Sequence, residues 1–303
     1  MTKISSKQEA LDYAIRDSEI SSESDFGYKI DGKDPYENYM SNKTWDIFLK
    51  QMPEEHYKQF EDGNGGELKE KKGRYGINPP KMASYGSSSR LIYELSKDID
   101  GFIFEERLDT RVGGTANLDG LLRKGNEYIY VEAKRREIYC SSHEKQEIKS
   151  VYKPVYEYLK SSQFSYDLED VKDTDEQENT MKITFKIDNE PVRYFDLKQL
   201  ICHFLGITYD LAKHSVKNTK VTFLYLLYNP NVIKDKIEEK YRNKVIDRYE
   251  EVKSFIINNN DIFKAIFYAV LQYQTEIHKF EKTHIEFDFK LVDQNTYIDE
   301  LKR

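Results

Sequence analysis

Three consecutive runs of apolar and β-prone residues predict strands at Phe102–Leu108, Asn117–Arg123 and Tyr128–Lys134. A helix is predicted directly before them, from about Arg90 to Ile99, because its apolar residues recur on one side. The sequence GSSS at residues 86–89 offers N-cap side chains for this helix. The predicted order is therefore one helix followed by three strands.

Further elements are predicted later in the chain. Asp196 is the expected N-cap of a helix with one apolar face, and Val221–Tyr228 is apolar on both faces, which is typical of a central strand. Two long helices are predicted at about Lys234–Asn258 and Asp261–Phe280, and a strand at residues 284–292 (HIEFDFKLV). Together these patterns indicate an α/β fold.

Two regions are less regular. The N-terminal part predicts helices around Lys7–Asp17 and Trp45–Phe60, followed by a stretch punctuated by Gly and Pro. An insert at residues 141–195 predicts a helix at Gln146–Leu159, an acidic loop and two β-like runs, MKITFKI and VRYFD.

The chain has no internal repeat and no low-complexity tract, which excludes solenoid and fibrous folds. We expect residues 1–85 to form a mostly helical and loop extension. Residues 86–230 should form the core, with the insert at about 141–195, and residues 231–303 should supply helices and a strand that pack on it.

Composition supports a folded protein, because 303 residues with 24 Tyr and 16 Phe can bury a sizeable core. Cys140 and Cys202 suggest neither a disulfide framework nor a thiolate zinc site. No signal peptide is recognisable at the start, and no apolar run approaches the roughly 20 residues that span a bilayer. A cytoplasmic protein without a membrane role is therefore expected.

The net charge of −7 argues against nonspecific coating of nucleic acid, but the charge is unevenly distributed. Residues Asp167–Glu178 hold seven acids and one Lys, whereas Lys69–Arg90 and Arg123–Lys149 are locally basic. A local groove for a polyanion is thus compatible with an acidic chain.

The most informative segment is ANLDGLLRKGNEYIYVEAKRRE, in which two β-prone runs flank Gly125-Asn126. A Gly-first pair is typical of a type II′ two-residue hairpin, so paired residues should have numbers that sum to 251. Asp119 then lies directly across from Glu132, and the period of two places Lys134 on the same face. The opposite face is apolar throughout, with Leu118, Gly120, Leu122, Ile129, Val131 and Ala133.

Two opposed carboxylates destabilise each other unless a hard cation bridges them. Mg²⁺ accepts one or two carboxylates together with waters and a substrate phosphate, and Mn²⁺ could substitute for it. Such a cation would neutralise a phosphodiester, and Lys134 could contact both the phosphate and the attacking water. A Glu-Ala-Lys triplet alone recurs by chance, and only its combination with the register, the apolar face and the capped helix favours a metal site.

These residues resemble the motif of the PD-(D/E)xK nuclease superfamily, with Asp119 on one strand and Glu132-Ala133-Lys134 on the next. Leu118 stands where the motif name has Pro. The resemblance covers roughly residues 87–228. It implies a restriction-endonuclease-like core, in which helices flank a mixed central β-sheet, with Asp119, Glu132 and Ala133 as the metal-binding residues.

The resemblance suggests two further catalytic residues. Family members often carry an acid on the first helix, for which Glu94 is the expected residue, and some carry a Gln on the helix after the motif Lys, which Gln199 matches. Either residue could equally be an ordinary surface side chain. Lys198 adjoins Gln199 and could bind nucleic acid, whereas His203 is expected to be a core-edge or surface histidine.

Other residues could position nucleic acid. Arg135 and Arg136 follow the motif Lys and would extend a cationic edge for a phosphate backbone, although pairing with Glu137 explains them as well. Ser88 and Ser89 could contact DNA from the N-terminal side.

The expected function is Mg²⁺-dependent hydrolysis of double-stranded DNA, in restriction or phage defence, by an endonuclease resembling Type II restriction enzymes. Cleavage of both strands would favour a homodimer, and restriction would imply a separately encoded methyltransferase. No GxxxxGK[ST] phosphate loop indicates a helicase motor.

Two alternatives remain. The fold could serve a repair or recombination nuclease, because fold does not fix substrate. It could also be a catalytically silent nucleic-acid-binding or assembly module. A glycosidase with paired carboxylates fits poorly, because Lys134 shares their face.

Overall fold

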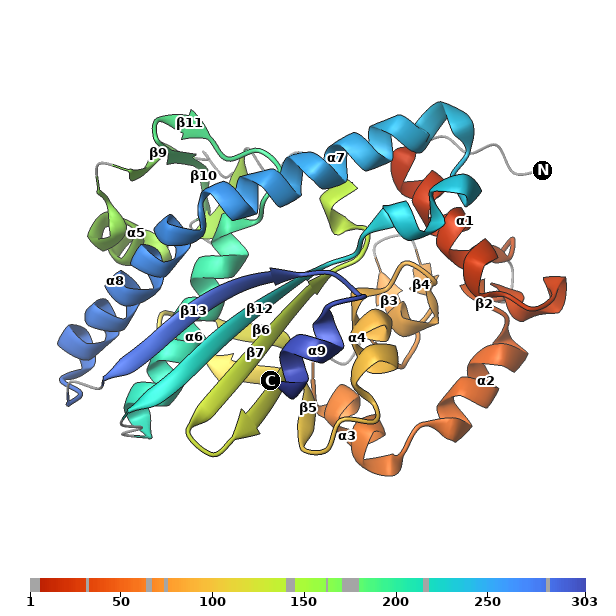
Figure 1. Cartoon of the computed structure of the whole chain (residues 1–303), viewed down its shortest axis with the longest axis horizontal. Coiled ribbons are helices and arrows are strands. Elements are labelled where there is room, and N and C mark those ends of the chain that lie inside the picture. The colour runs from red at the N-terminus through yellow and green to blue at the C-terminus, as the bar shows by residue number, and fades with distance from the viewer. Residues whose placement is uncertain are drawn as a thin grey trace.

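A five-stranded sheet forms the centre of the protein in the computed structural model (Figure 1). Its strands are β5 (Phe102–Asp109), β6 (Thr115–Lys124), β7 (Glu127–Lys134), β12 (Thr219–Leu227) and β13 (Ile285–Val292). The spatial order is β13-β12-β7-β6-β5. Strands β5, β6 and β7 pair antiparallel, whereas β12 runs parallel to both β7 and β13. The protein is thus α/β with a mixed central sheet, as predicted, and β12 is a central strand.

The structure describes residues 6–30, 33–63, 67–73, 76–139, 145–161, 163–170, 180–214, 218–281 and 284–303. Cys140 and most of the predicted acidic loop lie outside them. Within these ranges, no helix has both the length and the apolar composition needed to cross a bilayer.

Helices cover both faces of the sheet (Figure 1). One face carries α4 (Ser88–Ser96) and α9 (Tyr297–Lys302), joined by a 2.8 Å hydrogen bond between the hydroxyls of Ser96 and Tyr297. The other carries α6 (Leu197–Lys213), with α8 (Asn260–His278) beside it. Both predicted caps are confirmed. Ser87 accepts from the Arg90 amide at 3.2 Å, and Asp196 accepts from the Gln199 amide at 2.9 Å.

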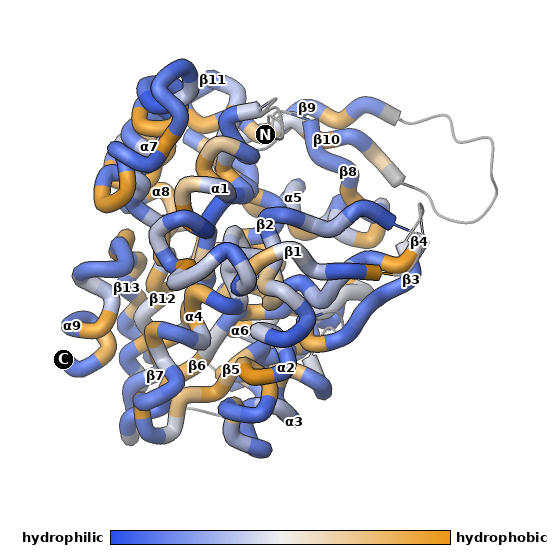
Figure 2. Tube along the Cα trace, turned by 90° about the vertical axis from the view of Figure 1, so that its right-hand side faces the viewer, coloured by the Kyte–Doolittle hydropathy of each residue, from blue (hydrophilic) through white to orange (hydrophobic). Residues whose placement is uncertain are grey.

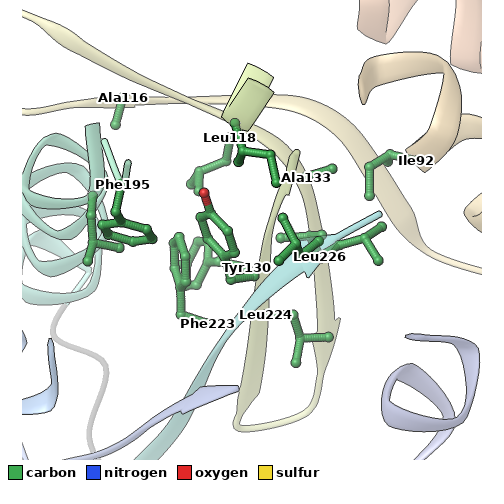
Figure 3. Close-up of a cluster of buried hydrophobic side chains, with 14 of the residues drawn as sticks. Ile92, Ala116, Leu118, Tyr130, Ala133, Phe195, Phe223, Leu224 and Leu226 are labelled. Atoms are coloured by element: carbon green, nitrogen blue, oxygen red, sulfur yellow. The ribbon is translucent and has the colours of Figure 1, made fainter. Parts of the chain in front are cut away.

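Aromatic side chains join these layers. Phe204 of α6 packs edge-on against Phe223 of β12 and Phe267 of α8, and Phe267 stacks on Phe287 of β13. Figure 3 shows Tyr130 and Phe223 on one side of the strands, with Leu224, Leu226 and Ile92 on the other. The sheet is therefore buried on both faces.

Gly206 lets α6 approach the sheet closely. A Cβ atom at this position would come within 2.7 Å of the Ala116 Cβ and 2.9 Å of the Leu108 Cβ. Any larger residue there would push the helix away from β5 and β6.

The N-terminal extension is more varied than predicted, because it also contains short strands. Its elements are α1 (Lys7–Glu19), β1 (Phe26–Tyr28), β2 (Tyr36–Met40), α2 (Asn42–Gln51), α3 (Glu54–Asp62), β3 (Lys71–Gly73) and β4 (Gly76–Asn78). The single helix predicted at Trp45–Phe60 is divided into α2 and α3. Proline disfavours the helical conformation in the residue before it, and Met52 before Pro53 has an extended ψ of 127°.

The insert forms a second small sheet. Its elements are β8 (Gln146–Lys149), α5 (Lys153–Leu159), β9 (Phe164–Asp170), β10 (Thr180–Ile187) and β11 (Glu190–Pro191), with β10 between β8 and β9.

Three predictions in the insert are wrong in whole or in part, although MKITFKI lies in β10 and the predicted helix is present over Lys153–Leu159. Residues 146–149 are a strand with alternating burial, and the helix begins only near Pro154, which suits a first helical turn. The described part of the acidic loop, Asp167–Asp170, belongs to β9. The run VRYFD is not a strand. Asp188 and Asn189 turn the chain after β10 with φ of 49° and 69°, but the pairing that follows ends at Pro191.

The long C-terminal helices are confirmed, with α7 at Glu239–Asn258 and α8 beginning at Asn260. Helix α7 crosses the top of the molecule and meets α1 (Figure 1). The terminal helix α9 was not predicted. Short 3-10 helices lie at Glu23–Asp25, Lys81–Ala83, Glu137–Tyr139, Ser150–Tyr152 and Pro230–Lys236.

Side chains cap both edges of the central sheet. At β5, the Gln59 side chain of α3 accepts a 2.8 Å hydrogen bond from the Phe104 amide. At β13, the Tyr268 hydroxyl accepts from the Phe287 amide at 3.0 Å, and Asn260 donates to the Phe289 carbonyl at 3.1 Å. Helical side chains thus occupy backbone groups that a further strand would need.

Candidate functional site

The β6–β7 hairpin has the predicted register. Gly125 turns the chain with φ of +57°, and the pairs run from Lys124↔Glu127 to Gly120↔Val131, each summing to 251. The ladder ends at that last pair, so the predicted direct pairing of Asp119 with Glu132 is not part of it. The next amide of β7 that points toward β6 is that of Ala133. It donates a 2.6 Å hydrogen bond to the Asp119 carboxylate and not to a main-chain carbonyl of β6. Along the other edge of β7, Glu132 and Lys134 still pair with β12.

Asp119, Glu132 and Lys134 meet in one cleft of about 710 Å³. Lys134 Nζ lies 2.6 Å from Glu132 Oε1, and both side chains are largely withdrawn from solvent. The hairpin therefore brings together the three residues that the spacing predicted. The hairpin does not, however, have one buried apolar face and one solvent-exposed polar face. Leu121 and Tyr130 lie on the same face as Asp119 and Glu132, and both are fully buried.

Helix α6 supplies two residues that hold this group in place. Gln199 Oε1 accepts a 2.7 Å hydrogen bond from Lys134 Nζ. One turn later, His203 Nε2 lies 3.0 Å from Glu132 Oε2. Gln199 thus contacts the motif lysine, and its catalytic role stays a prediction. His203 is 2% exposed and contacts Glu132, so it is not a surface residue.

The two carboxylates of the hairpin are in opposite electrostatic situations. Burial alone would raise the pKa of Glu132, but the Lys134 ammonium and the His203 imidazole bring it down to about 2. Burial raises the pKa of Asp119 well above its ordinary value, and the carboxylates of Glu132 and Glu105 raise it further. In the folded protein, Asp119 therefore holds a proton far more readily than Glu132 does.

Glu105 is a third acid that the sequence did not indicate. The pairs Phe104↔Gly120 and Glu106↔Leu118 place it across from Asp119, and its φ of +54° is strained for a residue within a strand. Ser89 donates a 3.1 Å hydrogen bond to it. Burial, with a contribution from Glu67, raises the pKa of Glu105 to about 7. Only the register between β5 and β6 could have revealed this residue, and no tight turn fixes that register.

Glu67 and Lys81 come from the N-terminal extension and form a 2.7 Å ion pair in the same cleft. Glu67 is 4% exposed. The extension is thus part of the cleft wall. The insert forms another part of it, through Glu147, Ile148, Lys149, Tyr152 and Tyr156.

Glu94 does not belong to the site. It is exposed, forms a 2.8 Å ion pair with Lys97, and is not among the residues that line the cleft. Helix α4 turns its N-terminal residues Ser88 and Ser89 toward the cleft, and Glu94 falls on its solvent side. The prediction of a catalytic acid on this helix is therefore wrong.

Arg135 is not available to a phosphate backbone, contrary to the prediction. It is 4% exposed, lies 5.0 Å over the Tyr228 ring and forms an ion pair with Glu19. The chain leaves β7 at this point and turns Arg135 inward beneath α1. Arg136 does line the cleft, but its guanidinium forms a 2.7 Å ion pair with Asp12.

The other predicted nucleic-acid contacts also line the cleft. Ser88 donates to Glu137 at 2.8 Å and accepts from the Arg135 amide at 3.0 Å. Lys198 donates to the Glu147 carbonyl at 3.2 Å. Ser88 and Ser89 therefore order the local structure, and Lys198 stands at the boundary between α6 and the insert.

The residues present suit a hard cation, although no group of three or more His, Cys, Asp or Glu side chains in the described ranges is arranged to hold a metal. Mg²⁺ needs only one or two carboxylates together with waters. Lys134 and His203 compensate Glu132, whereas Asp119 and Glu105 face each other in a buried setting that raises both pKa values. A divalent cation beside Asp119 would relieve that repulsion.

Replacing Glu105 with Gln should make stability less dependent on pH. The folded state raises the pKa of Glu105 from 4.5 to about 7, so it binds the proton more tightly than the unfolded state. Wild-type stability should therefore fall as the pH rises from about 4.5 to about 7, by roughly 1–3 kcal/mol. Urea unfolding at pH 5 and pH 8 in EDTA should show a smaller difference for Glu105→Gln. The exposed Glu94→Gln is the control, and an unchanged pH dependence in Glu105→Gln would contradict the assignment.

Comparison of the chain with protein-family models, with curated proteins and with solved structures found no match.

Proposed function

We propose that the protein is a Mg²⁺-dependent endonuclease that hydrolyses phosphodiester bonds of double-stranded DNA. One observation carries the proposal: Asp119, Glu132 and Lys134 converge in a large cleft where β6 and β7 stop pairing. This is the arrangement that the PD-(D/E)xK resemblance requires.

The order of elements supports the same proposal. Helix α4, the antiparallel strands β5, β6 and β7, helix α6 and the parallel strand β12 follow one another in the sequence expected of a restriction-endonuclease-like core. The acids lie at one end of the hairpin, on the face covered by α6. A substrate would reach them from the cleft.

Asp119 and Glu132, with the main chain at Ala133, would hold Mg²⁺. When bound, the cation would neutralise the scissile phosphate and lower the pKa of a water molecule. Burial opposes the charge of Lys134, but Glu132 outweighs it and raises the pKa of Lys134 above its ordinary value. Lys134 is therefore a cationic donor to the phosphate and the attacking water, not a base at neutral pH. Gln199 orients its ammonium, and His203 orients Glu132.

The biological setting that follows from the resemblance is restriction or phage defence in the cytoplasm. Cleavage of both DNA strands requires two active sites, which a homodimer would provide. A methyltransferase encoded separately would protect the host DNA.

The test is incubation of purified protein with plasmid and phage DNA in Mg²⁺, Mn²⁺ or EDTA, with RNA and single-stranded DNA in parallel. Discrete, metal-dependent fragments are expected from duplex DNA. Asp119→Asn should abolish both cleavage and the increase in Tm that Mg²⁺ causes in the wild type. Glu94→Gln, outside the cleft, should retain both.

Other results would overturn all or part of the proposal. Cleavage of RNA alone would show that the substrate is RNA and not double-stranded DNA. Intact nucleic acid in every metal, together with a Tm that Mg²⁺ does not change, would show a catalytically silent module.

A further inference from the structure

A lysine of the N-terminal extension lies in the cleft beside the acids of the central sheet. Lys81 is the first residue of the 3-10 helix Lys81–Ala83. It lines the cleft with Glu67 of the extension and with Glu105 and Asp119 of the sheet. Lys134 reaches the same cleft from β7, so the acids have a lysine on the sheet and another on the extension.

The main chain around Lys81 is held by hydrogen bonds. The Met82 amide donates to the Glu67 carbonyl at 3.0 Å, and the Ser84 amide donates to the Lys81 carbonyl at 3.0 Å. Met82 and Ala83 are fully buried. The Lys81 side chain therefore starts from a fixed point in the cleft wall.

Glu67 holds the end of this side chain. Lys81 Nζ donates a 2.7 Å hydrogen bond to Glu67 Oε1, and the Glu67 side chain is 5% exposed whereas that of Lys81 is 59% exposed. A lysine ammonium has three N–H donors. Within the described ranges Glu67 is the acceptor that Lys81 has, so two donors remain for a ligand in the cleft.

The charge of Lys81 is reinforced by the acids around it. Burial opposes that charge, but the carboxylates of Glu67, Glu105 and Asp119 together raise the pKa of Lys81 above its ordinary value. The ammonium is thus near enough to Glu105 and Asp119 to be affected by their charges. Lys81 remains a cation at neutral pH and donates hydrogen bonds without giving up its proton.

The extension and the insert form opposing parts of the cleft wall. Figure 2 shows strands β1 to β4 of the extension on the same side of the molecule as β8 of the insert. Tyr39 of β2 and Glu147 of β8 both line the cleft. A substrate strand in the cleft would therefore have the extension, with Lys81, along one side.

A phosphodiester can use cations on more than one side. In phosphoryl transfer, negative charge is spread over the equatorial oxygens, and the attacking and leaving oxygens lie roughly in line on opposite sides of phosphorus. Lys134 is held between Glu132 and Gln199, so it can serve only the oxygens near β7. The remaining oxygens need a donor from another wall.

We propose that Lys81 is a second catalytic cation, which contacts the scissile phosphate from the extension side of the cleft, and that Glu67 positions its ammonium. This inference rests on the proposed function, because it takes a phosphodiester as the occupant of the cleft. It gives the N-terminal extension a direct part in the reaction.

The test removes Lys81 without leaving the buried Glu67 carboxylate uncompensated. Glu67→Gln/Lys81→Ala is compared with Glu67→Gln, in which the amide oxygen still accepts from Lys81. Single-turnover cleavage of plasmid DNA in Mg²⁺ should be at least about 10-fold slower in the double variant, at an equal Tm. Lys81→Arg should retain most of the wild-type rate, because Arg also donates to phosphate.

Binding is measured in parallel, with a fluorescent 30-base-pair duplex, by anisotropy in EDTA over a range of salt concentrations. The slope of log K against log salt should be smaller by about 1 in the double variant than in Glu67→Gln, since each phosphate contact contributes about 0.9. The control is Glu54→Gln/Lys58→Ala, which removes an exposed 3.0 Å ion pair of α3, in the same extension but not in the cleft lining. Its rate, affinity and slope should match the wild type.

The two measurements separate this inference from the nuclease proposal. Where the wild type cleaves, the rate decides: equal rates in Glu67→Gln and the double variant would overturn the role of Lys81 and leave the nuclease standing. Where the wild type only binds, the slope decides: a reduced slope would support the phosphate contact and overturn the nuclease, and an unchanged slope would overturn both. A Lys81→Arg variant as slow as the double variant would contradict a role for charge at this position. A wild type that neither cleaves nor binds would overturn both proposals.

Discussion

Lys134→Ala should slow DNA cleavage at least about 100-fold, because removal of one preorganised group that stabilises transition-state charge typically costs that much or more. Lys134 is held between Glu132 and Gln199, so its ammonium has a fixed position in the cleft. Single-turnover cleavage of plasmid DNA at saturating Mg²⁺ measures the loss. Binding of the duplex should change far less, because one phosphate contact among several is lost.

The chain offers a matched control for this variant. Lys97 also forms a 2.8 Å ion pair with a glutamate, Glu94, but on the solvent side of α4. Lys97→Ala should cleave at the wild-type rate. If Lys134→Ala retained most of the activity with a normal Tm, the assignment of its role would be wrong.

Glu19→Ala should destabilise the folded protein by roughly 3 kcal/mol, because loss of one partner leaves buried charge uncompensated. Glu19, at the end of α1, forms ion pairs with both Arg90 and Arg135. These guanidinium groups are 1% and 4% exposed. Burial lowers the pKa of Arg90 to about 10, although Glu19 opposes that change. Urea unfolding, monitored by circular dichroism, measures the free energy of unfolding.

A neighbouring surface pair provides the comparison. Asp17 pairs with Arg16 at 2.6 Å but is 45% exposed. Asp17→Ala should therefore cost less than about 1 kcal/mol. Equal stabilities of Glu19→Ala and Asp17→Ala would show that the buried arginines do not depend on α1.

The central sheet could be predicted from the sequence because its signals are local. The Gly125-Asn126 turn fixed the β6–β7 register, and the doubly apolar run at Val221–Tyr228 marked a strand covered on both faces. The prediction of the insert was wrong because the signals there are not local. Strand β8 pairs with β10, which is distant in the sequence, and residues 146–149 are too short for their alternation to be distinguished from a helix.

The site could be predicted where it depends on one hairpin, and the resemblance added Gln199 of α6, which contacts Lys134. Glu105 and Glu67 reach it through the β5–β6 pairing and the folding of the extension, neither of which leaves a pattern in the sequence. The prediction that Arg135 contacts a phosphate backbone was wrong for a related reason. A cation beside a motif lysine appears exposed in the sequence, and only the position of α1 shows that Glu19 covers it.

The capped edges of the central sheet restrict how two copies of this protein can associate. A partner strand at β13 would have to displace Tyr268 and Asn260, and one at β5 would have to displace Gln59. Strand addition at either edge would therefore exchange existing hydrogen bonds for new ones with little net gain. The homodimer proposed here should accordingly form through helices or through the extension, and the same caps should protect the folded protein against growth into sheet-like aggregates.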